Sequence, residues 1–365
     1  MLENKGVIIN AGLHLKTAEK LISAVSNGVS ISDDDGARQL ADKLRQNIYS
    51  FSAAKSFTQM MYYRDMMIGD DGHILPVGSF IKKIADTGEI FNKKFLTTEY
   101  ENAHYSAIMA SNWESFQDDD LLQYSTVGDS NVRPSHAAMD KYTAPKSAAF
   151  WRVNYPPNGW NCRCSVVPGK GHAINKLTEA EAVRQLTAEN KDTPFYNNVG
   201  ISKVIFKDNH PYFINSNGKE TDLSWEQYGM NNIAKIRAEA LAPYVTASLE
   251  EYVKWWNQQD KIKNSESIGF LDMFGSRIVL KKDSAKNGIY QHAKNVEFII
   301  THPDEVWMKP SDKTRKVYLK YFEDETIKIT VNNINQIEAI ITIKKGEASE
   351  VKKLNEARKG VLMYR

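Results

Sequence analysis

A turn-rich stretch between Tyr124 and Pro168 constrains this chain more than any other part of its sequence. It holds both cysteines of the chain, Cys162 and Cys164, and a Pro-Pro-Asn-Gly run at residues 156–159. Two prolines fix φ, and Asn-Gly tolerates left-handed backbone, so this run predicts a tight turn. The stretch therefore predicts a closely folded, irregular segment that follows helical sequence.

The two cysteines alternate with Arg163 in a Cys-Arg-Cys run. In an extended segment, residues i and i+2 point to the same side, so both sulfurs are expected on one side and Arg163 on the other. Two thiolates on one side could hold a soft metal such as zinc, with His136 and either Asp129 or a further histidine completing four ligands. Reduced structural thiols and a disulfide, for which the Cys-x-Cys ring is tight, stay open as alternatives.

A second polar set lies around the predicted turn at Pro134. It comprises Asp129, Arg133, His136 and Asp140. We expect Asp129 and Arg133 to pair across this turn. A catalytic role for Asp129 with His136 is the weaker interpretation, since neither a nucleophile nor a phosphate-binding loop lies beside them.

The order of these residues resembles a known family. Residues 124–136 read Y-x-T-x-x-D-x-x-V-R-P-x-H, and F-W and P-P-N-G-W-x-C-R-C follow. This text resembles the phage Mu F-like minor head protein family, also called the phage head morphogenesis domain, over roughly residues 45–215. The resemblance implies a mainly helical head domain, phage portal and head proteins as partners, and localisation in the virion. Lys141 departs from it, because relatives usually carry glycine there.

Composition limits the class of protein. A chain of 365 residues with 42% hydrophobic and 25% charged residues is typical of a soluble protein of two or three domains. The net charge of +2 does not indicate a polyanionic partner for the whole chain. Two cysteines exclude a disulfide scaffold and fit a reducing cytoplasm. We expect no membrane span and no secretory signal, because an apolar run of about 18 residues and a basic start followed by an apolar stretch are both missing.

Periodicity predicts helices in the first third of the chain. Apolar residues recur every three or four positions in HLKTAEKLISAVSNGV and ADKLRQNIYSF, and further helices are expected over 51–72 and 77–117. Residues 170–215 are expected to be loop-rich, with a terminal strand at HPYFI. Residues 216–250 read as a charged helix interrupted at Pro243.

The C-terminal sequence has a different pattern, with short β-branched and aromatic runs. RIVLKK, VYLKYF, IKITVNN and EAIITIKK predict strands, and GIYQHAKNVEFIITHPDEVWMK predicts a helix that ends at a proline. In HPDEVW we expect Val306 and Trp307 to pack, and Asp304 and Glu305 to be exposed. Residues 285–365 hold fifteen Lys and Arg against eleven Asp and Glu, which weakly favours a phosphate-rich partner. A helix followed by a meander of strands indicates a small α+β domain.

This region also resembles a family. H-P-D-E-V-W, Y-L-K-Y-F and R-K-G-V-L-M-Y are similar to the phage-associated nuclease toxins of the barnase–EndoU–colicin E5/D–RelE-like (BECR) superfold, over roughly residues 265–365. The resemblance implies a ribonuclease that needs no metal or other cofactor and acts on RNA. It also implies a polymorphic-toxin cargo on a head protein, delivered with the virion to the host cytoplasm, and a cognate immunity protein as a partner.

The prediction is therefore a multidomain α+β protein. Residues 1–215 form the head morphogenesis domain, mainly helical with the turn-rich cysteine segment. Residues 216–260 form a helical connector. Residues 261–365 form a small BECR-like domain with an antiparallel sheet.

The ribonuclease chemistry implied by the resemblance needs four kinds of group. The RNA 2′-hydroxyl attacks the adjacent phosphate, a base takes its proton, an acid protonates the leaving oxygen, and cations stabilise the phosphorane. Candidate residues are His292 for acid/base chemistry, Lys320 and Arg358 for phosphate, Thr342 for a hydrogen bond, and Tyr364 for base stacking or proton donation. His302 is the rival histidine and is interpreted as capping a turn before Pro303. Each of these residues has a structural alternative as a solvated or core side chain.

Two other functions compete with the ribonuclease. One is a structural head protein whose basic C-terminal domain binds DNA or portal without catalysis. The other is an ADP-ribosyltransferase cargo, which is disfavoured because the Ser-Thr-Ser strand of that class is missing from the sequence.

Overall fold

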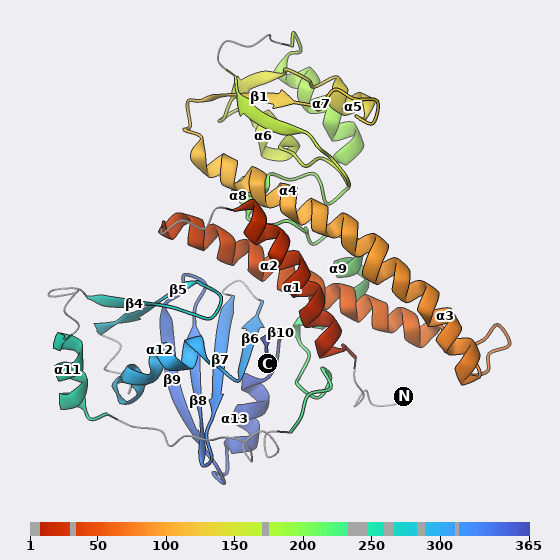
Figure 1. The fold of residues 1–365 in the computed structure, drawn as a ribbon. Coiled ribbons are helices and arrows are strands. Elements are labelled where there is room, and N and C mark those ends of the chain that lie inside the picture. The colour runs from red at the N-terminus through yellow and green to blue at the C-terminus, as the bar shows by residue number, and fades with distance from the viewer. Residues whose placement is uncertain are drawn as a thin grey trace. The chain divides into compact units, whose positions relative to one another are not determined.

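The computed structural model describes residues 8–29, 34–169, 175–232, 247–258, 266–282, 289–310 and 314–365 (Figure 1). The chain forms two compact units. The helical unit comprises residues 16–217, and the sheet unit comprises residues 1–15 together with 218–365. This division into helices and a separate antiparallel sheet confirms the predicted multidomain α+β class. None of the helices in the described residues is long and apolar enough to cross a membrane.

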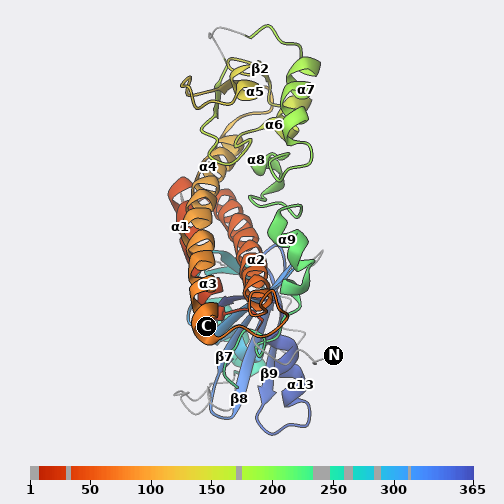
Figure 2. The same ribbon diagram turned by 90° about the vertical axis from the view of Figure 1, so that its right-hand side faces the viewer.

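Long helices dominate the helical unit. They are α1 (Ala11–Gly28, which begins in the sheet unit), α2 (Asp35–Asp65), α3 (Val77–Glu89), a π-helical segment (Ile90–Phe95) and α4 (Leu96–Ser115). The Asp34 side chain caps α2 by accepting a hydrogen bond from the amide of Ala37. In Figure 2, α2 and α4 run side by side. The helices predicted from periodicity are confirmed.

A buried polar group ties the end of this unit to its long helices. Lys55 of α2 pairs with Glu99 of α4, and the Tyr212 hydroxyl donates to Glu99 at 3.2 Å. Tyr212 belongs to α9 (Pro211–Ser216), which packs against α2 (Figure 2). The strand predicted at HPYFI is therefore wrong. Pro211 occupies the first helical turn and the ring of His210 accepts from the Tyr212 amide, and these are signals for a helix start.

The turn-rich stretch builds a small sheet of its own. Its antiparallel strands are β1 (Leu121–Ser125), β2 (Thr143–Pro145) and β3 (Ser165–Pro168), in the order β2-β1-β3. Around it lie α5 (Pro134–Ala137), α6 (Ala149–Asn154), α7 (Glu179–Asn190) and α8 (Val199–Ser202). Large buried aromatic rings fill the core, namely Tyr124, Tyr142, Phe150, Trp151 and Tyr155. Lys141 has φ 64°, a left-handed conformation that explains why glycine suits its position.

The sheet unit is built on five antiparallel strands in the order β10-β6-β7-β8-β9. They are β6 (Glu305–Lys309), β7 (Arg315–Tyr321), β8 (Glu325–Val331), β9 (Ile337–Lys344) and β10 (Val361–Tyr364), and a separate hairpin joins β4 (Ser267–Leu271) to β5 (Arg277–Lys281). The strands predicted at β5, β7, β8 and β9 are confirmed. The prediction for β6 is wrong, because its sequence was assigned to the end of a helix. That helix is shorter, with a 3-10 segment (Ile289–Asn295) and then α12 (Val296–Thr301).

Helices cover the two faces of this sheet. α12 and α13 (Glu350–Ala357) lie on opposite faces (Figure 1), and α11 (Leu249–Gln258) contacts the 3-10 segment. Residues 218–232, predicted to be part of a charged helix, form a 3-10 turn (Lys219–Thr221) and further turns instead. The rest of that predicted helix up to residue 246 lies outside the described residues. The turns belong to the sheet unit, where Tyr228 packs edge-on against Trp307 at 5.5 Å between ring centroids.

Candidate metal centre and candidate nuclease site

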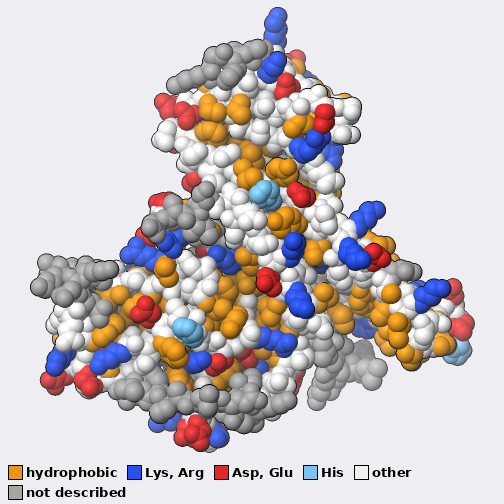
Figure 3. Space-filling model, in the orientation of Figure 1, with side chains coloured by type: hydrophobic (Ala, Val, Ile, Leu, Met, Phe, Trp, Pro, Cys, Tyr) orange, Lys and Arg blue, Asp and Glu red, His pale blue; other side chains and the backbone are white. Residues whose placement is uncertain are grey.

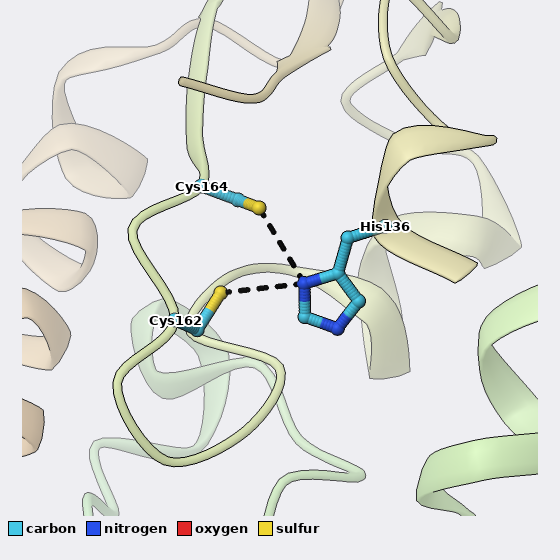
Figure 4. A group of neighbouring side chains, drawn as sticks. All are labelled: His136, Cys162 and Cys164. Atoms are coloured by element: carbon cyan, nitrogen blue, oxygen red, sulfur yellow. Dashed lines mark hydrogen bonds between the residues drawn. The ribbon is translucent and has the colours of Figure 1, made fainter. Parts of the chain in front are cut away.

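Three side chains of the helical unit meet in one buried cluster, which we call the Cys-His cluster (Figure 4). It consists of His136, Cys162 and Cys164, and the three potential ligand atoms lie within 4.8 Å of one another. His136 Nδ1 lies 3.7 Å from Cys162 Sγ and 3.5 Å from Cys164 Sγ. Both sulfurs therefore face the same imidazole nitrogen, as the Cys-x-Cys spacing predicts.

Local backbone geometry sets this arrangement. Pro134 starts α5 and so places His136 in its single turn. Across from it, Gly159 adopts φ 152°, and a Cβ there would lie 3.1 Å from the Arg133 guanidinium. The same guanidinium donates to the carbonyl oxygen of Trp160 at 2.8 Å. A side chain at residue 159 would therefore disturb the loop that carries both cysteines.

The environment of the cluster separates its two thiols. The hydrogen bond with Cys164, helped by His136, lowers the pKa of Cys162 to about 4 despite burial. The hydrogen bond to Cys162, together with burial, raises the pKa of Cys164. One thiolate beside one thiol is the arrangement expected when two sulfurs share a proton near an imidazole. Metal binding would deprotonate the second thiol as well.

The donor atoms fit a tetrahedral zinc ion. Zinc–sulfur bonds of about 2.3 Å and zinc–nitrogen bonds of about 2.05 Å at the tetrahedral angle place nitrogen and sulfur about 3.6 Å apart. The two distances from His136 Nδ1, 3.5 Å and 3.7 Å, bracket that value. The residues therefore supply three suitable ligands, all of them buried. Nearby, the buried Tyr124 hydroxyl accepts from Asn158 Nδ2 at 3.2 Å.

Asp129 does not belong to the Cys-His cluster. Its carboxylate forms a bidentate pair with Arg163, with both distances 2.8 Å, and both side chains are exposed. Arg163 thus points away from the cysteines, as predicted. The predicted pair of Asp129 with Arg133 is wrong, because Arg133 contacts Glu189 at 3.6 Å as well as Trp160. These contacts give no support to a catalytic role for Asp129 with His136.

In the sheet unit, the predicted residues His292, Lys320 and Thr342 lie on one face of the sheet. Lys320 pairs in register with Ile327, and Ile327 pairs with Thr342, so the three side chains form a cross-strand row. His292 Nε2 lies 2.7 Å from the Thr342 hydroxyl. Lys320 and Thr342 are two strand spacings apart, or about 10 Å. His292 and Thr342 are thus brought together, and Lys320 lies farther along the same row.

His292 is sealed inside the protein. Only 2% of it is exposed, and burial lowers its pKa from 6.5 to about 4. Such a histidine is neutral near pH 7, which suits a hydrogen bond to Thr342. Proton exchange with a bound substrate would require the 3-10 segment to move.

Arg358 is separated from the row by the sheet. It is fully buried and forms two hydrogen bonds with Glu305, from Nε at 2.9 Å and from Nη2 at 2.7 Å. Glu305 is in register with Leu319, so it points to the face opposite Lys320. The expectation that Glu305 is exposed is therefore wrong: 1% of it is accessible. Trp225 covers the guanidinium at 4.6 Å.

Tyr364 lies at the open end of β10. It pairs in register with Val306, next to an irregularity in the strand, and 38% of it is exposed. Its hydroxyl could reach a ligand without any change in the fold. The hydrogen bonds of Arg358 go instead to Glu305 and to the carbonyl of Asn231.

Comparisons with known proteins assign the two regions. Residues 76–167 match the family described as Phage Mu protein F like protein, and residues 256–365 match phage-Barnase-EndoU-ColicinE5/D-RelE like nuclease2. The chain joins a Mu F-like region to a region of this nuclease family. Both predicted resemblances are thereby confirmed.

Two curated relatives match the Mu F-like part. One is "Putative capsid assembly protein F" of Escherichia phage Mu, 48% identical over 44 residues, which are 12% of this chain and 10% of that protein. The other is the Mu-like prophage FluMu F protein of Haemophilus influenzae (strain ATCC 51907 / DSM 11121 / KW20 / Rd), 28% identical over 120 residues, or 31% of this chain and 29% of that protein. The chain thus matches less than a third of either relative. No solved structure matches it.

The sheet unit also carries a surface pocket of about 630 Å³ between residues 224–226 and α13. Its lining includes Trp225, Lys352 and Lys359. Trp225 already donates to Asn355, and Lys359 already pairs with Asp222. None of the predicted nuclease residues lines this pocket.

Three side chains gather around Lys320; sequence reasoning kept one of them only as a rival histidine and gave the other two no nuclease role. Asp304 Oδ1 lies 3.0 Å from Lys320 Nζ, and the centre of the Phe298 ring lies 5.5 Å from it. The His302 ring lies 5.5 Å from the Phe298 ring, between centroids. Strand register and the end of α12 bring them together. A sequence signal was present in the spacing of Phe298 and His302, four residues apart, although the predicted helix ran past both.

Proposed function

We propose that this protein is a phage minor head protein that carries a metal-independent ribonuclease on its C-terminal unit. One observation carries the proposal: a Mu F-like match and a nuclease-family match occur in one chain. The second match coincides with a five-stranded antiparallel sheet that bears a partly exposed lysine, Lys320, beside α12. The head and portal proteins of the particle would be the partners of the Mu F-like region.

The proposed reaction is attack of an RNA 2′-hydroxyl on the adjacent phosphate. It gives a 2′,3′-cyclic phosphate and a free 5′-hydroxyl, and it requires only proton transfers and cationic stabilisation. This chain offers Lys320 for the phosphate and Tyr364 for contact with RNA, and both are partly accessible. Delivery with the virion, action in the host cytoplasm and a cognate immunity protein complete the proposal.

The alternative is a structural head protein whose basic C-terminal unit binds DNA or portal. The excess of lysine and arginine after residue 285 is compatible with it. The two functions differ in whether RNA is consumed.

The test uses the purified full-length chain with a mixed-sequence RNA in EDTA. We expect cleavage to products with a 2′,3′-cyclic phosphate, and we expect the matching 2′-deoxy strand to stay intact. RNA that stays intact at every pH and salt concentration tested would refute the ribonuclease. DNA binding under the same conditions would then support the structural alternative.

For the Cys-His cluster we propose a structural zinc ion. Three donors at tetrahedral spacing support it, with water or a neighbouring group as the fourth ligand. The full-length chain should contain about one zinc per molecule, and Cys162→Ser should lose it. His73→Ala, at an exposed histidine outside the cluster, is the control that keeps the metal. Metal-free wild-type protein with unchanged thermal stability after zinc addition would refute this assignment.

A further inference from the structure

A group of side chains at one end of the sheet has the composition of a phosphodiester site. We call it the α12 patch, and it comprises Phe298, His302, Asp304 and Lys320. The rings of Phe298 and His302 stack with 5.5 Å between centroids and 25° between planes. Lys320 Nζ lies 5.5 Å from the centre of the Phe298 ring and 3.0 Å from Asp304 Oδ1. An aromatic ring, an imidazole and a cation are thus within reach of one ligand.

The α12 patch is accessible, unlike the predicted pair of His292 and Thr342. Phe298 is 47% exposed, and His302 is exposed, whereas the other histidines described in the sheet unit, His14 and His292, are buried. Figure 3 shows hydrophobic, basic and histidine side chains together on the surface over α12. A substrate could therefore reach this patch without local unfolding.

The backbone holds Lys320 in a defined position. Asp304 Oδ2 accepts from the amide of Tyr321 at 2.7 Å, and the amide of Asp304 donates to the Leu319 carbonyl at 2.8 Å. Both neighbours of Lys320 on β7 therefore hold Asp304, Tyr321 through the carboxylate and Leu319 through the backbone amide. An ammonium group has three protons, and Asp304 accepts one of them. The others can reach a phosphate oxygen.

Thr301 selects the tautomer of His302. The Thr301 hydroxyl donates to the Glu297 carbonyl at 2.7 Å, and His302 Nδ1 lies 2.9 Å from the same hydroxyl oxygen. Because the hydroxyl proton is directed at the carbonyl, the oxygen accepts from Nδ1–H. A neutral His302 therefore presents the lone pair of Nε2, which is the form required of a general base.

We propose that the α12 patch is the phosphodiester site of the proposed ribonuclease, with His302 as its base. Nε2 of His302 takes the proton of a 2′-hydroxyl, and the 2′-oxygen forms a bond to phosphorus. Lys320 binds the phosphate oxygens, and Phe298 packs against the adjoining base. The bond from phosphorus to the 5′-oxygen breaks, the leaving oxygen takes a proton from water, and the resulting hydroxide removes the proton from Nε2.

This inference rests on the proposed function, and the experiment separates the two. The full-length chain is tested with RNA, beside His302→Ala, Lys320→Met and the control Lys352→Met on α13, on the opposite face. We expect His302→Ala to lose about 100-fold or more in rate, as is usual for a general base. Added imidazole should restore part of that loss, which a purely structural role would not permit. The control should cleave at the wild-type rate.

Binding gives a second readout that does not depend on cleavage. Phe298→Ala and Lys320→Met should each weaken binding of a non-cleavable 2′-O-methyl RNA by about tenfold, in line with one lost stacking or phosphate contact. If His302→Ala fails to fold, His302→Gln takes its place. Wild-type protein that never cleaves RNA refutes the proposed function. Wild-type cleavage that His302→Ala and Lys320→Met leave unchanged refutes the α12 patch alone.

Discussion

Replacement of Arg358 by alanine should destabilise the sheet unit rather than remove a catalytic group. The guanidinium is fully buried, and its two hydrogen bonds to Glu305 are the main compensation for a carboxylate that is itself 1% exposed. Glu305 also accepts from Trp307 Nε1 at 2.8 Å, and Arg358 donates to the carbonyl of Asn231 at 3.0 Å. Without the arginine, the carboxylate would stay buried beside the Trp307 indole with no positive charge paired to it.

The size of the effect follows from that geometry. Removing one partner of a buried ion pair costs about 3–5 kcal/mol, mostly as the penalty of the uncompensated charge. For a unit of this length, 1 kcal/mol corresponds to about 2–4 °C in melting temperature. Arg358→Ala should therefore lower the transition of the sheet unit by roughly 6–20 °C.

The assay is urea and thermal unfolding of the full-length chain, followed by circular dichroism and tryptophan fluorescence. Arg315→Ala is the matched control on the same sheet. Arg315 pairs with Glu338 at 2.6 Å, but both side chains are partly exposed, at 43% and 34%. Its loss should cost no more than about 1 kcal/mol.

A double variant tests the reason for the loss. Glu305→Gln combined with Arg358→Met removes both charges while keeping an acceptor for Trp307, so its cost should be smaller than the sum of the single costs by about 1–3 kcal/mol. Arg358→Ala with wild-type stability and no ribonuclease activity would refute this reasoning and return Arg358 to a direct role at phosphate.

Three further predictions concern other sites. Because burial lowers the pKa of His292 to about 4, the unfolded chain binds a proton on this residue at a higher pH than the folded chain does. Up to about 3 kcal/mol of stability present above pH 6.5 should therefore be lost as the pH falls toward 4. His292→Asn should flatten the pH dependence of the urea midpoint between pH 7 and pH 5. Gly200→Ala should cost about 1–3 kcal/mol, because the new methyl would lie 2.3 Å from the Trp113 side chain, whereas Gly78→Ala meets no atom within 4 Å and should be neutral or better in the same urea titration. Zinc removal by a chelator should lower the melting temperature of the helical unit in wild type and leave Cys162→Ser unaffected, as differential scanning calorimetry would register.

The Cys-His cluster was predictable because its geometry is local. A spacing of two residues in an extended run brings Cys162 and Cys164 to the same side. Pro134 starts the helical turn that carries His136. The partner of Asp129 was not predictable in the same way. Two arginines, Arg133 and Arg163, lie in the same irregular stretch, and the loop geometry decides which of them pairs with Asp129.

The candidate nuclease residues were harder to place, because strand register and packing decide their neighbours. Glu305 looks solvent-exposed in HPDEVW, and its partner Arg358 is 53 residues away in sequence. His292 has the best intrinsic chemistry for acid/base work, but the fold buries it against Thr342. His302, which sequence alone suggests is a turn cap, is accessible, unlike the other histidines described in the sheet unit. Chemical type is visible in a sequence, whereas access to solvent depends on packing.

The extent of the sheet unit determines which residues must be present when the proposed nuclease is tested. His14 Nε2 contacts the carbonyl of Leu362 at 2.6 Å, the amide of Gly360 donates to Leu223, and Tyr228 covers Trp307. All three contacts involve residues outside the matched region 256–365. The edge strand β10 and the buried Arg358 are thus completed by residues 8–15 and 218–232, so we propose that the working nuclease unit includes them. A fragment cut to the family match would expose β10 and the guanidinium together, and its inactivity would report on folding and not on chemistry. Activity in the full chain that persists in a fragment starting at residue 256 would show that these flanking segments are dispensable.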